Sequence, residues 1–516
     1  MNKAFFYSKA YLLCPCILLL FYLALPYRYQ NCDAIRYAEA IESKQIRADI
    51  IWHPSHILYG PLGYVIYNGL DKIGITYSPL KIYSIIGIIS SALIVLIMGL
   101  LMVHLGASEI LVAPFLLFWM SIYVVWICST SSDHARNLIA ILFILSAFYS
   151  IVLSKEIGLK GWPYLTGLLI GFAAISHILS IFAALPLFYF AHRIANDKIK
   201  VLTKVFGTSF IFVSVCFFSI AAKLQGVKDP KAFLEWFADP GGSQWLQLNP
   251  IKGTADLAIT TIRSLFGIIT YSQLKTAILA GGTQNTLILF LAILAVGIIG
   301  SYSLIILKTL VRSPQKFSPL AKAMMIWFCF QALFAVFFDS GNIRMVLYLG
   351  VPFMIILIDS LRMQSSPHAA YLALVAFIIV MGINISTVFL KESNPKTQKA
   401  YQVLNSMNTI SRDSGDLFIV ATCTDALFSR YFGNKEAIHL DPKSLSVHDL
   451  YSIVHRTLSS GGTAFISNDL VPHLRKRMHE AKDPLPESLI FSQHSLSVSD
   501  NAFQIVSIRD PILHTE

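Results

Sequence analysis

Long apolar stretches recur along the chain as far as residue 390, and they restrict the fold more than any other feature. A helix needs about 20 apolar residues to cross the hydrocarbon core of a bilayer. Eleven stretches approach or exceed this length, at residues 9–26, 79–103, 109–128, 135–153, 162–177, 178–191, 201–221, 284–307, 320–338, 345–361 and 370–390. Of the 516 residues, 55% are hydrophobic and only 13% are charged, whereas a soluble protein carries about 25% charged residues. The sequence therefore predicts a polytopic α-helical membrane protein.

Basic residues are concentrated in alternate loops, and this predicts the orientation of the chain. Cytoplasmic loops carry an excess of Lys and Arg. The basic loops contain Lys155 and Lys160, then Arg193, Lys198, Lys200 and Lys204, then Lys308, Arg312, Lys316 and Lys322, then Arg362. We expect these loops and the N-terminus to be cytoplasmic, with residues 27–78, 129–135 and 222–283 and the C-terminus outside a plasma (bacterial inner) membrane. Because the loops account for the formal net charge of +11, nucleic acid is not an expected partner.

The composition changes after residue 391, where the expected membrane module, residues 1–391, ends. Residues 392–516 alternate between predicted helices (396–410, 426–432 and 447–458) and predicted strands (416–421, 463–467, 488–492 and 502–508). Such alternation is typical of a small α/β domain. The domain contains no dinucleotide-binding glycine motif, no P-loop and no nucleophile elbow. We expect it to be extracytoplasmic and to have an accessory role.

The first and third external segments are long enough to carry function. In residues 27–78, Asp33 opens a short amphipathic helix, and the sequence Trp52-His53-Pro54 precedes several tyrosines. Since Trp and Tyr favour the headgroup level, we expect this segment to lie half-buried on the membrane surface. Residues 222–283 form an unusually long connection with a turn at Asp239-Pro240, which suggests a lid.

Four polar residues are expected at the outer ends of the spans: Asp33, Asp133, His177 and Arg344. One carboxylate could act as a general base while the other orients it or binds a divalent cation. Arg and His could hold a phosphate whose negative charge grows as its bond breaks. Each residue also has a structural interpretation. Asp33 could cap a helix, Asp133 could pair with Arg136, His177 could be an ordinary interfacial histidine, and Arg344 could anchor a span.

At these residues the chain resembles the GT-C class of membrane glycosyltransferases, which includes protein O-mannosyltransferases (family 39) and the aminoarabinose transferase of lipid A. The class commonly has the pattern D-x-x-x-Y-A in its first external loop, followed by a basic-Pro or His-Pro step. Here the pattern runs from Asp33 through Tyr37 to Ala38, and His53-Pro54 follows. A second acid about a hundred residues later matches Asp133, a basic residue at an outer hairpin matches His177, and a late arginine with aromatics matches Arg344. The resemblance covers about residues 1–390.

The resemblance implies that the protein transfers a sugar with inversion from a polyprenyl-phosphate donor to an acceptor. The donor lies among the membrane lipid, and the acceptor is a glycan, lipid or protein. The resemblance implies that Asp33 and Asp133 are catalytic, with Asp33 as the base. It also implies that Tyr37, His53, His177 and Arg344 bind substrate. Members often have paired acids, whereas here Cys32 precedes Asp33 and His134 follows Asp133. A divalent cation (Mg or Mn) at Asp33 and Asp133 therefore stays open.

Two other functions are compatible with the sequence. A transporter or lipid-linked-sugar flippase usually places ionisable residues in mid-span and contains inverted repeats, neither of which is visible here. A non-catalytic scaffold would use the C-terminal domain to bind a partner, and Asp33 would then only cap a helix.

Overall fold

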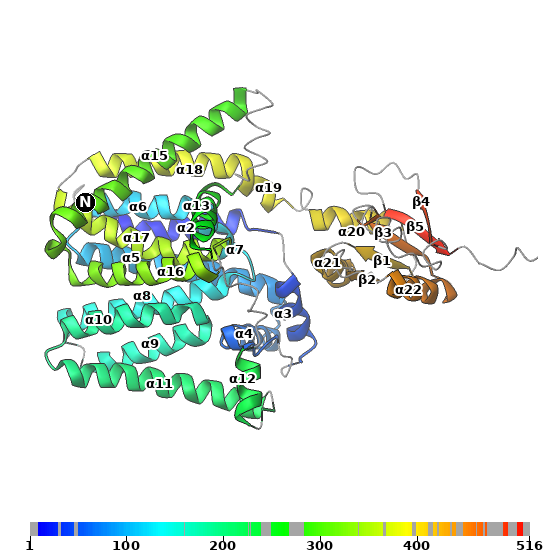
Figure 1. Cartoon of the computed structure of the whole chain (residues 1–516), viewed down its shortest axis with the longest axis horizontal. Helices are drawn as coiled ribbons and strands as arrows, with labels where there is room; N and C mark the ends of the chain where they lie inside the picture. Colours follow the sequence, from blue (N-terminus) through cyan, green and yellow to red (C-terminus); the bar gives the residue numbers. More distant parts are fainter. Residues whose placement is uncertain are drawn as a thin grey trace, which may run out of the picture. The chain divides into compact units, whose positions relative to one another are not determined.

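The computed structural model describes residues 9–28, 32–45, 50–158, 160–224, 226–227, 229–238, 249–267, 283–338, 340–364, 368–394, 399–410, 416–420, 423–433, 436–439, 447–460, 462–467, 470–471, 489–493 and 503–508. Contacts divide the chain into two compact units (Figure 1). The first unit contains Met1–Tyr27 and Ala40–Ser393, and the second contains Arg28–Glu39 and Asn394–Glu516. Arg28–Glu39, which the sequence placed with the membrane module, therefore groups by its contacts with the C-terminal residues.

All regular secondary structure among the described residues of the first unit is helical. Its helices are η1 (Ala10–Leu13), α2 (Cys14–Ala24), η2 (Pro54–His56), α4 (Tyr59–Lys72), α5 (Pro79–His104), α6 (Glu109–Ser121), α7 (Tyr123–Thr130), α8 (Ala135–Ile157), α9 (Trp162–Ser176), η3 (Ile178–Ala183), α10 (Ala184–Ile194), α11 (Lys198–Lys223), α12 (Pro230–Ala238), α13 (Pro250–Phe266), α15 (Thr283–Arg312), η5 (Pro314–Lys316), α16 (Pro319–Phe338), α17 (Ile343–Gln364), α18 (His368–Asn384), the π-helical turn η6 (Ile385–Phe389) and α19 (Leu390–Ser393).

Every apolar stretch expected to span the membrane is helical, although residues 109–128 are divided between two helices, α6 and α7. Among the described residues, seven helices are long and apolar enough to cross a bilayer, or eight if the bent pair α6 and α7 is one span. Three shorter apolar helices cover Tyr11–Ala24, Trp162–Ser176 and Ile178–Ile194. The expected polytopic α-helical membrane fold is confirmed.

The long helices of this unit run side by side (Figure 1). Helix α9 packs between α8 and α11, and α6 packs along α18. Since lipid gives little hydrophobic drive for helices to associate, close packing has to hold such a bundle together. Large side chains such as Trp126, Phe148 and Trp327 are fully buried in one continuous core.

The bundle is interrupted between α6 and α7, where the chain bends by 67° at Ile122. A break inside a membrane protein leaves backbone carbonyls that need other partners. Tyr22 donates to the carbonyl of Met120 at 2.7 Å, and Asn384 donates to that of Ser121 at 2.9 Å. Asn384 also donates to the carbonyl of Leu265 at the end of α13. Side chains from distant helices therefore stabilise the bend.

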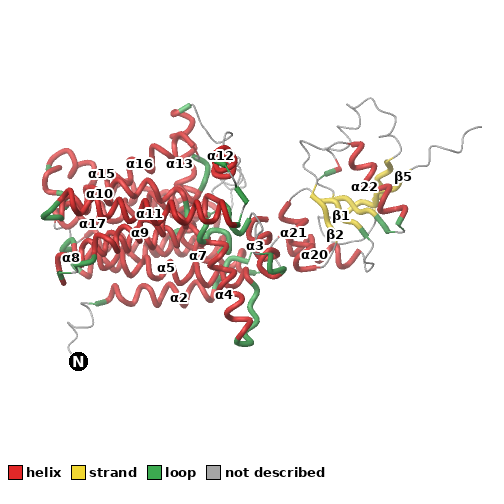
Figure 2. The backbone as a smooth tube through the Cα atoms, turned by 90° about the horizontal axis from the view of Figure 1, so that it is seen from below, coloured by secondary structure: helices red, strands yellow, loops and turns green. Residues whose placement is uncertain are grey.

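The second unit contains a five-stranded sheet. Its elements are α3 (Cys32–Glu42, whose last residues belong to the first unit), α20 (Lys399–Ile410), β1 (Leu417–Val420), α21 (Cys423–Gly433), β2 (Glu436–His439), α22 (Val447–Ser459), β3 (Ala464–Ser467), β4 (Leu489–Gln493) and β5 (Phe503–Ile508). The strand order is β2-β1-β3-β5-β4. Strand β1 is parallel to β2 and β3, whereas β5 is antiparallel to β3 and β4. Figure 2 shows the strands in yellow, confined among the described residues to this unit.

Helices cover both faces of this sheet. Ile419 of β1 packs with Leu450 and Val454 of α22 on one face. Phe418 and Val420 pack on the other face with side chains from α20 and α21. Strands buried on both faces need continuous apolar runs, and β1 reads Leu-Phe-Ile-Val. The expected α/β domain is therefore present, and β2 is a strand that the sequence reasoning missed.

Candidate functional site

Asp133 lies in the turn that joins α7 to α8, and close packing holds this turn in place. Gly87 of α5 lets the end of α7 approach, because a Cβ there would lie 2.4 Å from the carbonyl oxygen of Ser129. The hydroxyl of Tyr59 donates to the carbonyl of Ser132, and its ring stacks on Tyr83 at 4.3 Å. Asp133 thus sits just before the N-terminus of α8, where the helix dipole favours a negative charge.

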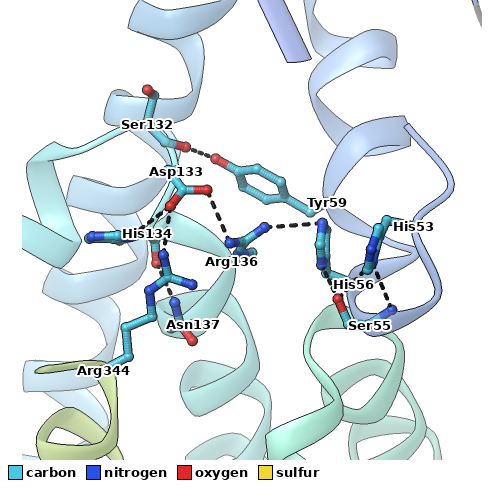
Figure 3. A network of polar contacts seen from close by, with 10 residues as sticks. All are labelled: His53, Ser55, His56, Tyr59, Ser132, Asp133, His134, Arg136, Asn137 and Arg344. Atoms are coloured by element: carbon cyan, nitrogen blue, oxygen red, sulfur yellow. Dashed lines mark hydrogen bonds and ion pairs between the residues drawn. The ribbon is translucent and has the colours of Figure 1, made fainter. Parts of the chain in front are cut away.

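The carboxylate of Asp133 is completely buried and has three basic neighbours (Figure 3). Its Oδ2 lies 2.8 Å from Nη2 of Arg344 and 3.0 Å from Nδ1 of His134. Its Oδ1 lies 3.1 Å from Nη2 of Arg136. A buried carboxylate is tolerated only when paired in this way. The side chain of Arg344 is 21% exposed, whereas that of Arg136 is only 6% exposed. Of the two arginines that contact Asp133, Arg344 is therefore the more accessible.

The charges around Asp133 set its protonation state. Burial by itself would raise the pKa of this carboxyl, but the guanidinium groups of Arg136 and Arg344, with His134, hold that pKa well below its usual range. Burial and the charge of Arg344 lower the pKa of His134, although Asp133 opposes this. At neutral pH, Asp133 is therefore ionised and His134 is neutral.

A second group of polar residues extends this cluster through Arg136. Nη1 of Arg136 lies 3.0 Å from Nε2 of His56, which is 5% exposed. Nδ1 of His56 lies 2.6 Å from Oγ of Ser55, which lies 2.8 Å from Nδ1 of His53. The rings of His53 and His56 stack with centroids 4.7 Å apart. Figure 3 shows the result, a continuous chain of polar contacts from His53 to Arg344.

The local sequence explains why His53 and His56 face each other. Pro54 opens the short helix η2, and His53 is its N-cap, accepting a hydrogen bond from the amide of Ser55. The amide of Leu58 donates to the carbonyl of Ile175 at 2.9 Å, which fastens the segment to the end of α9. Burial lowers the pKa of His56 well below its usual range, and the charge of Arg136 lowers it further. Residues 54–59 are thus more deeply buried than the half-buried surface segment that we expected.

His177 and Tyr348 lie near the same end of the bundle. His177 caps η3, and its Nδ1 accepts a hydrogen bond from the amide of Leu179 at 3.3 Å. Its ring centroid lies 6.2 Å from that of Tyr348, one turn after Arg344 on α17. Both side chains are buried.

The structure thus gathers several of the sequence-predicted residues. It joins Asp133 and Arg344 directly and links His53 to them through His56 and Arg136. Asp33 and Tyr37 belong to the second unit, where Ile35 packs with Leu404 and Leu427. Asp33 is the second residue of α3 and is partly buried, while Tyr37 is fully buried. The Asp239-Pro240 turn of the expected lid lies outside the described residues.

Sequence reasoning missed His56, His134 and Tyr59 and treated Arg136 only as an ion-pair partner. Two signals could have pointed to them. His53 and His56 are three residues apart around a proline, which can place both rings on one side of a helical turn. The sequence Asp133-His134-Ala135-Arg136 places an acid and an arginine at the i,i+3 spacing of a helix start.

The residues around Asp133 do not suit a divalent cation. Both of its oxygens face guanidinium groups, whose charges would repel a metal ion. Within the described ranges, no three His, Cys, Asp or Glu side chains are grouped closely enough to hold a metal. The arrangement around Asp133 and Arg344 suits an anion instead, because guanidinium groups bind phosphate and carboxylate strongly.

The fold and this cluster define a polytopic membrane protein with a charged centre at one end of its helix bundle. No protein-family model and no curated protein matches the sequence. Among the solved structures that share the fold are two glycosyltransferases. ArnT from Cupriavidus metallidurans, bound to undecaprenyl phosphate, matches with a TM-score of 0.51 and 12% identity over 96% of this chain and 97% of that one. The oligosaccharyltransferase of Archaeoglobus fulgidus, in complex with zinc and sulfate, matches with a TM-score of 0.51 and 13% identity over 95% of this chain and 72% of that one. The chain therefore has a GT-C-like glycosyltransferase fold.

Proposed function

We propose that this protein transfers a sugar from a polyprenyl-phosphate-linked donor to an acceptor at the outer face of the membrane. One observation carries the proposal. In a chain with this fold, the partly exposed guanidinium of Arg344 is fixed by the buried carboxylate of Asp133 at one end of the bundle. An arginine held in this way is prepared to bind an anion, because little side-chain freedom is left to lose on binding.

The phosphate of the donor is the anion that suits this position. A polyprenyl phosphate keeps its chain in the bilayer and its phosphate at the surface, which is where a site at the end of a membrane helix lies. The ArnT structure that shares the fold holds undecaprenyl phosphate, and this supports a polyprenyl-phosphate ligand here. In the proposal Arg344 contacts the phosphate, while His177 and His53 line its surroundings.

The distribution of basic residues supports an outer position for the site. Asp133 precedes the first residue of α8, whereas Lys155 lies at its other end. Arg344 is the second residue of α17, while the basic residue of its last turn is Arg362. Since basic loops stay in the cytoplasm, the cluster is proposed to face outward, with the N-terminus inside and the C-terminal α/β domain outside.

The proposed reaction is a single displacement that inverts the anomeric carbon. An acceptor hydroxyl or amine forms a bond to this carbon while the bond from the carbon to the phosphate oxygen breaks. The electron pair leaves with the polyprenyl phosphate, whose charge grows by one unit and is stabilised by Arg344. The proton of the acceptor passes to Asp33 as general base. Asp33 is assigned this role, and Tyr37 a role in binding substrate, from their sequence pattern.

The acceptor is proposed to be a glycan, lipid or protein, and the C-terminal domain is proposed to help orient it. A Mg or Mn ion held through Asp33 is a further proposal, and chelation tests it. If no cation takes part, treatment with EDTA leaves the transfer rate unchanged.

The function is tested by incubating the purified protein with a panel of synthetic polyprenyl-phosphate sugars and a cell-envelope acceptor fraction. The expected result is sugar transfer from one donor, with release of polyprenyl phosphate. We expect Asp33→Asn to lower the rate by about 10²–10⁴-fold with little change in donor binding, because Asn keeps the shape and most of the hydrogen bonding of Asp but cannot take a proton. The control is Glu42→Gln, an exposed position near the end of the same helix. If Asp33→Asn transfers at the wild-type rate, Asp33 is not the base. Movement of the donor across vesicles without transfer would instead favour a flippase.

A further inference from the structure

We infer that His56 is a positioning residue of the proposed phosphate site. It holds Arg136 in the ion pair with Asp133 that in turn fixes Arg344, and Ser55 and His53 hold His56 in the tautomer that this requires. The inference deepens the proposed function and rests on it for the identity of the ligand.

The direction of each hydrogen bond between Arg136 and His53 can be worked out from Arg136, whose guanidinium group has no acceptor. A guanidinium can only donate, so Nε2 of His56, 3.0 Å from Nη1 of Arg136, has to accept. In a neutral imidazole the other nitrogen then carries the proton, so Nδ1 of His56 donates to Oγ of Ser55 at 2.6 Å. The hydroxyl of Ser55 is left to donate to Nδ1 of His53 at 2.8 Å. Every link from His53 to Arg136 therefore has one consistent direction.

Arg136 is held on two edges by this arrangement. Its Nη1 is directed at His56 and its Nη2 at Oδ1 of Asp133, 3.1 Å away. Asp133 then offers its other oxygen, Oδ2, to Arg344 at 2.8 Å. Without an acceptor at His56, Arg136 loses the contact of its Nη1, and its ion pair with the carboxylate that fixes Arg344 is less well oriented. His56 therefore acts on the phosphate only through two other residues.

The neutrality of His56 is part of the arrangement. A protonated ring could not accept from Arg136 and would place a third positive charge beside the two guanidinium groups. His56 is buried and stacked on His53, which leaves little room for a rotated ring. The sequence His53-Pro54-Ser55-His56 supplies the cap, the turn, the bridging hydroxyl and the acceptor within one short segment.

The first experiment compares three variants for their affinity for radiolabelled polyprenyl phosphate in detergent micelles. His56→Gln keeps a neutral acceptor, His56→Phe fills the space without one, and Ser55→Ala removes the bridge. We expect the Phe variant to bind about 5- to 30-fold more weakly and the Gln variant to recover most of this loss. His104→Gln, at an exposed histidine paired with Glu156, is the control.

Three outcomes of this experiment would overturn the inference. The first is that His56→Phe binds polyprenyl phosphate with wild-type affinity. The second is that His56→Gln loses as much affinity as His56→Phe. The third is that unfolding of the variants at the temperature of the assay accounts for the whole loss of affinity. If the wild-type protein itself binds no polyprenyl phosphate, the proposed function fails, and the second experiment then decides the positioning role.

The second experiment needs no ligand. The ¹⁵N chemical shifts of histidine-labelled protein in lipid discs report which ring nitrogen carries the proton, and the His56→Gln variant assigns the signal of His56. We expect a neutral His56 protonated at Nδ1 at pH 7, with a mixture of tautomers in Ser55→Ala. An imidazolium or an Nε2-protonated ring in the wild-type protein would contradict the inference.

Discussion

Arg344 and Asp133 are 211 residues apart in the sequence, and their side chains meet at 2.8 Å. Arg344 is the second residue of α17, and Asp133 lies just before α8, so the contact joins the ends of two long membrane helices. The carboxylate is buried and the guanidinium is partly exposed, so the pair links the two helices and leaves a positive group at the end of the bundle.

Removal of the charge at Asp133 should destabilise the protein. Asp133→Asn leaves Arg136 and Arg344 without their shared counter-ion, and breaking a buried pair costs about 3–5 kcal/mol. We expect a clear fall in the midpoint of thermal unfolding, measured in detergent by intrinsic fluorescence. Asp71→Asn, at an exposed carboxyl, is the control and should unfold like the wild type. Equal stability of the two variants would mean that the ion pair does not hold these helices.

Stability should also depend on pH through the buried histidines. The pKa of His56 is well below the ordinary value of 6.5, and that of His134 is also lowered. As the pH falls below 6.5, the unfolded chain takes up these protons before the folded protein does, so the folded state loses up to about 1.4 kcal/mol per pH unit for each histidine. The lowered pKa of Asp133 affects stability only at much lower pH. The carboxylate stabilises the folded state fully above pH 3.8, and this contribution is lost only as the pH falls through the pKa of Asp133 in the folded protein.

Thermal unfolding between pH 5 and pH 8 checks this pH dependence. The midpoint should be flat above pH 7 and should fall below pH 6.5. His56→Gln should make the fall shallower, whereas His104→Gln should keep the wild-type slope. A midpoint that rises on acidification would show that His56 is protonated in the folded protein.

Asn384 should be important for the bend between α6 and α7. Asn384→Leu has a similar volume but leaves the carbonyls of Ser121 and Leu265 without this donor. An unsatisfied buried carbonyl costs about 1–3 kcal/mol, so we expect a marked loss of thermal stability. Asn68→Leu, which removes only a local bond to the carbonyl of Tyr64, should have a much smaller effect. Comparable losses in the two variants would contradict the role of Asn384.

The orientation of the chain can be tested with a matched pair of introduced cysteines. Lys231→Cys lies on α12, where the lysine is 87% exposed, and Lys316→Cys lies in η5 between two spans. In intact cells a membrane-impermeant thiol reagent should label the first and not the second. The wild-type protein controls for its own cysteines. The reverse labelling would place the cluster around Asp133 at the cytoplasmic face.

Much of the fold can be predicted from the sequence because the bilayer imposes one simple rule on every span. Each expected apolar stretch is helical, since a helix satisfies all of its backbone hydrogen bonds within its own segment in lipid. The short strand β2 was not predicted, because the sequence Glu-Ala-Ile-His shows too little alternation of polar and apolar residues to be recognised as a strand. Its place in the sheet depends on pairing with β1, which local sequence does not reveal.

The site is predictable only in part. Hydropathy places Asp133 and Arg344 at span ends, but their ionic pairing depends on tertiary packing, in which α5 contacts both α8 and α17. The contact between His56 and Arg136 crosses 80 residues and depends on how η2 docks against α9. No periodic pattern marks such docking. For the same reason, the grouping of Arg28–Glu39 with the C-terminal residues was not foreseen, because it depends on contacts such as that of Ile35 with Leu404.

The central claim is that Arg344 binds the phosphate of a polyprenyl-linked sugar donor, and one measurement tests it most directly. The rate of sugar transfer from a defined donor is compared for the wild type, Arg344→Gln and Arg312→Gln, the last at an exposed arginine that ends α15. We expect kcat/KM to fall by about 10²–10³-fold in Arg344→Gln, since loss of one charge-stabilising donor costs this much, and to stay unchanged in Arg312→Gln. Wild-type transfer by folded Arg344→Gln would contradict the account.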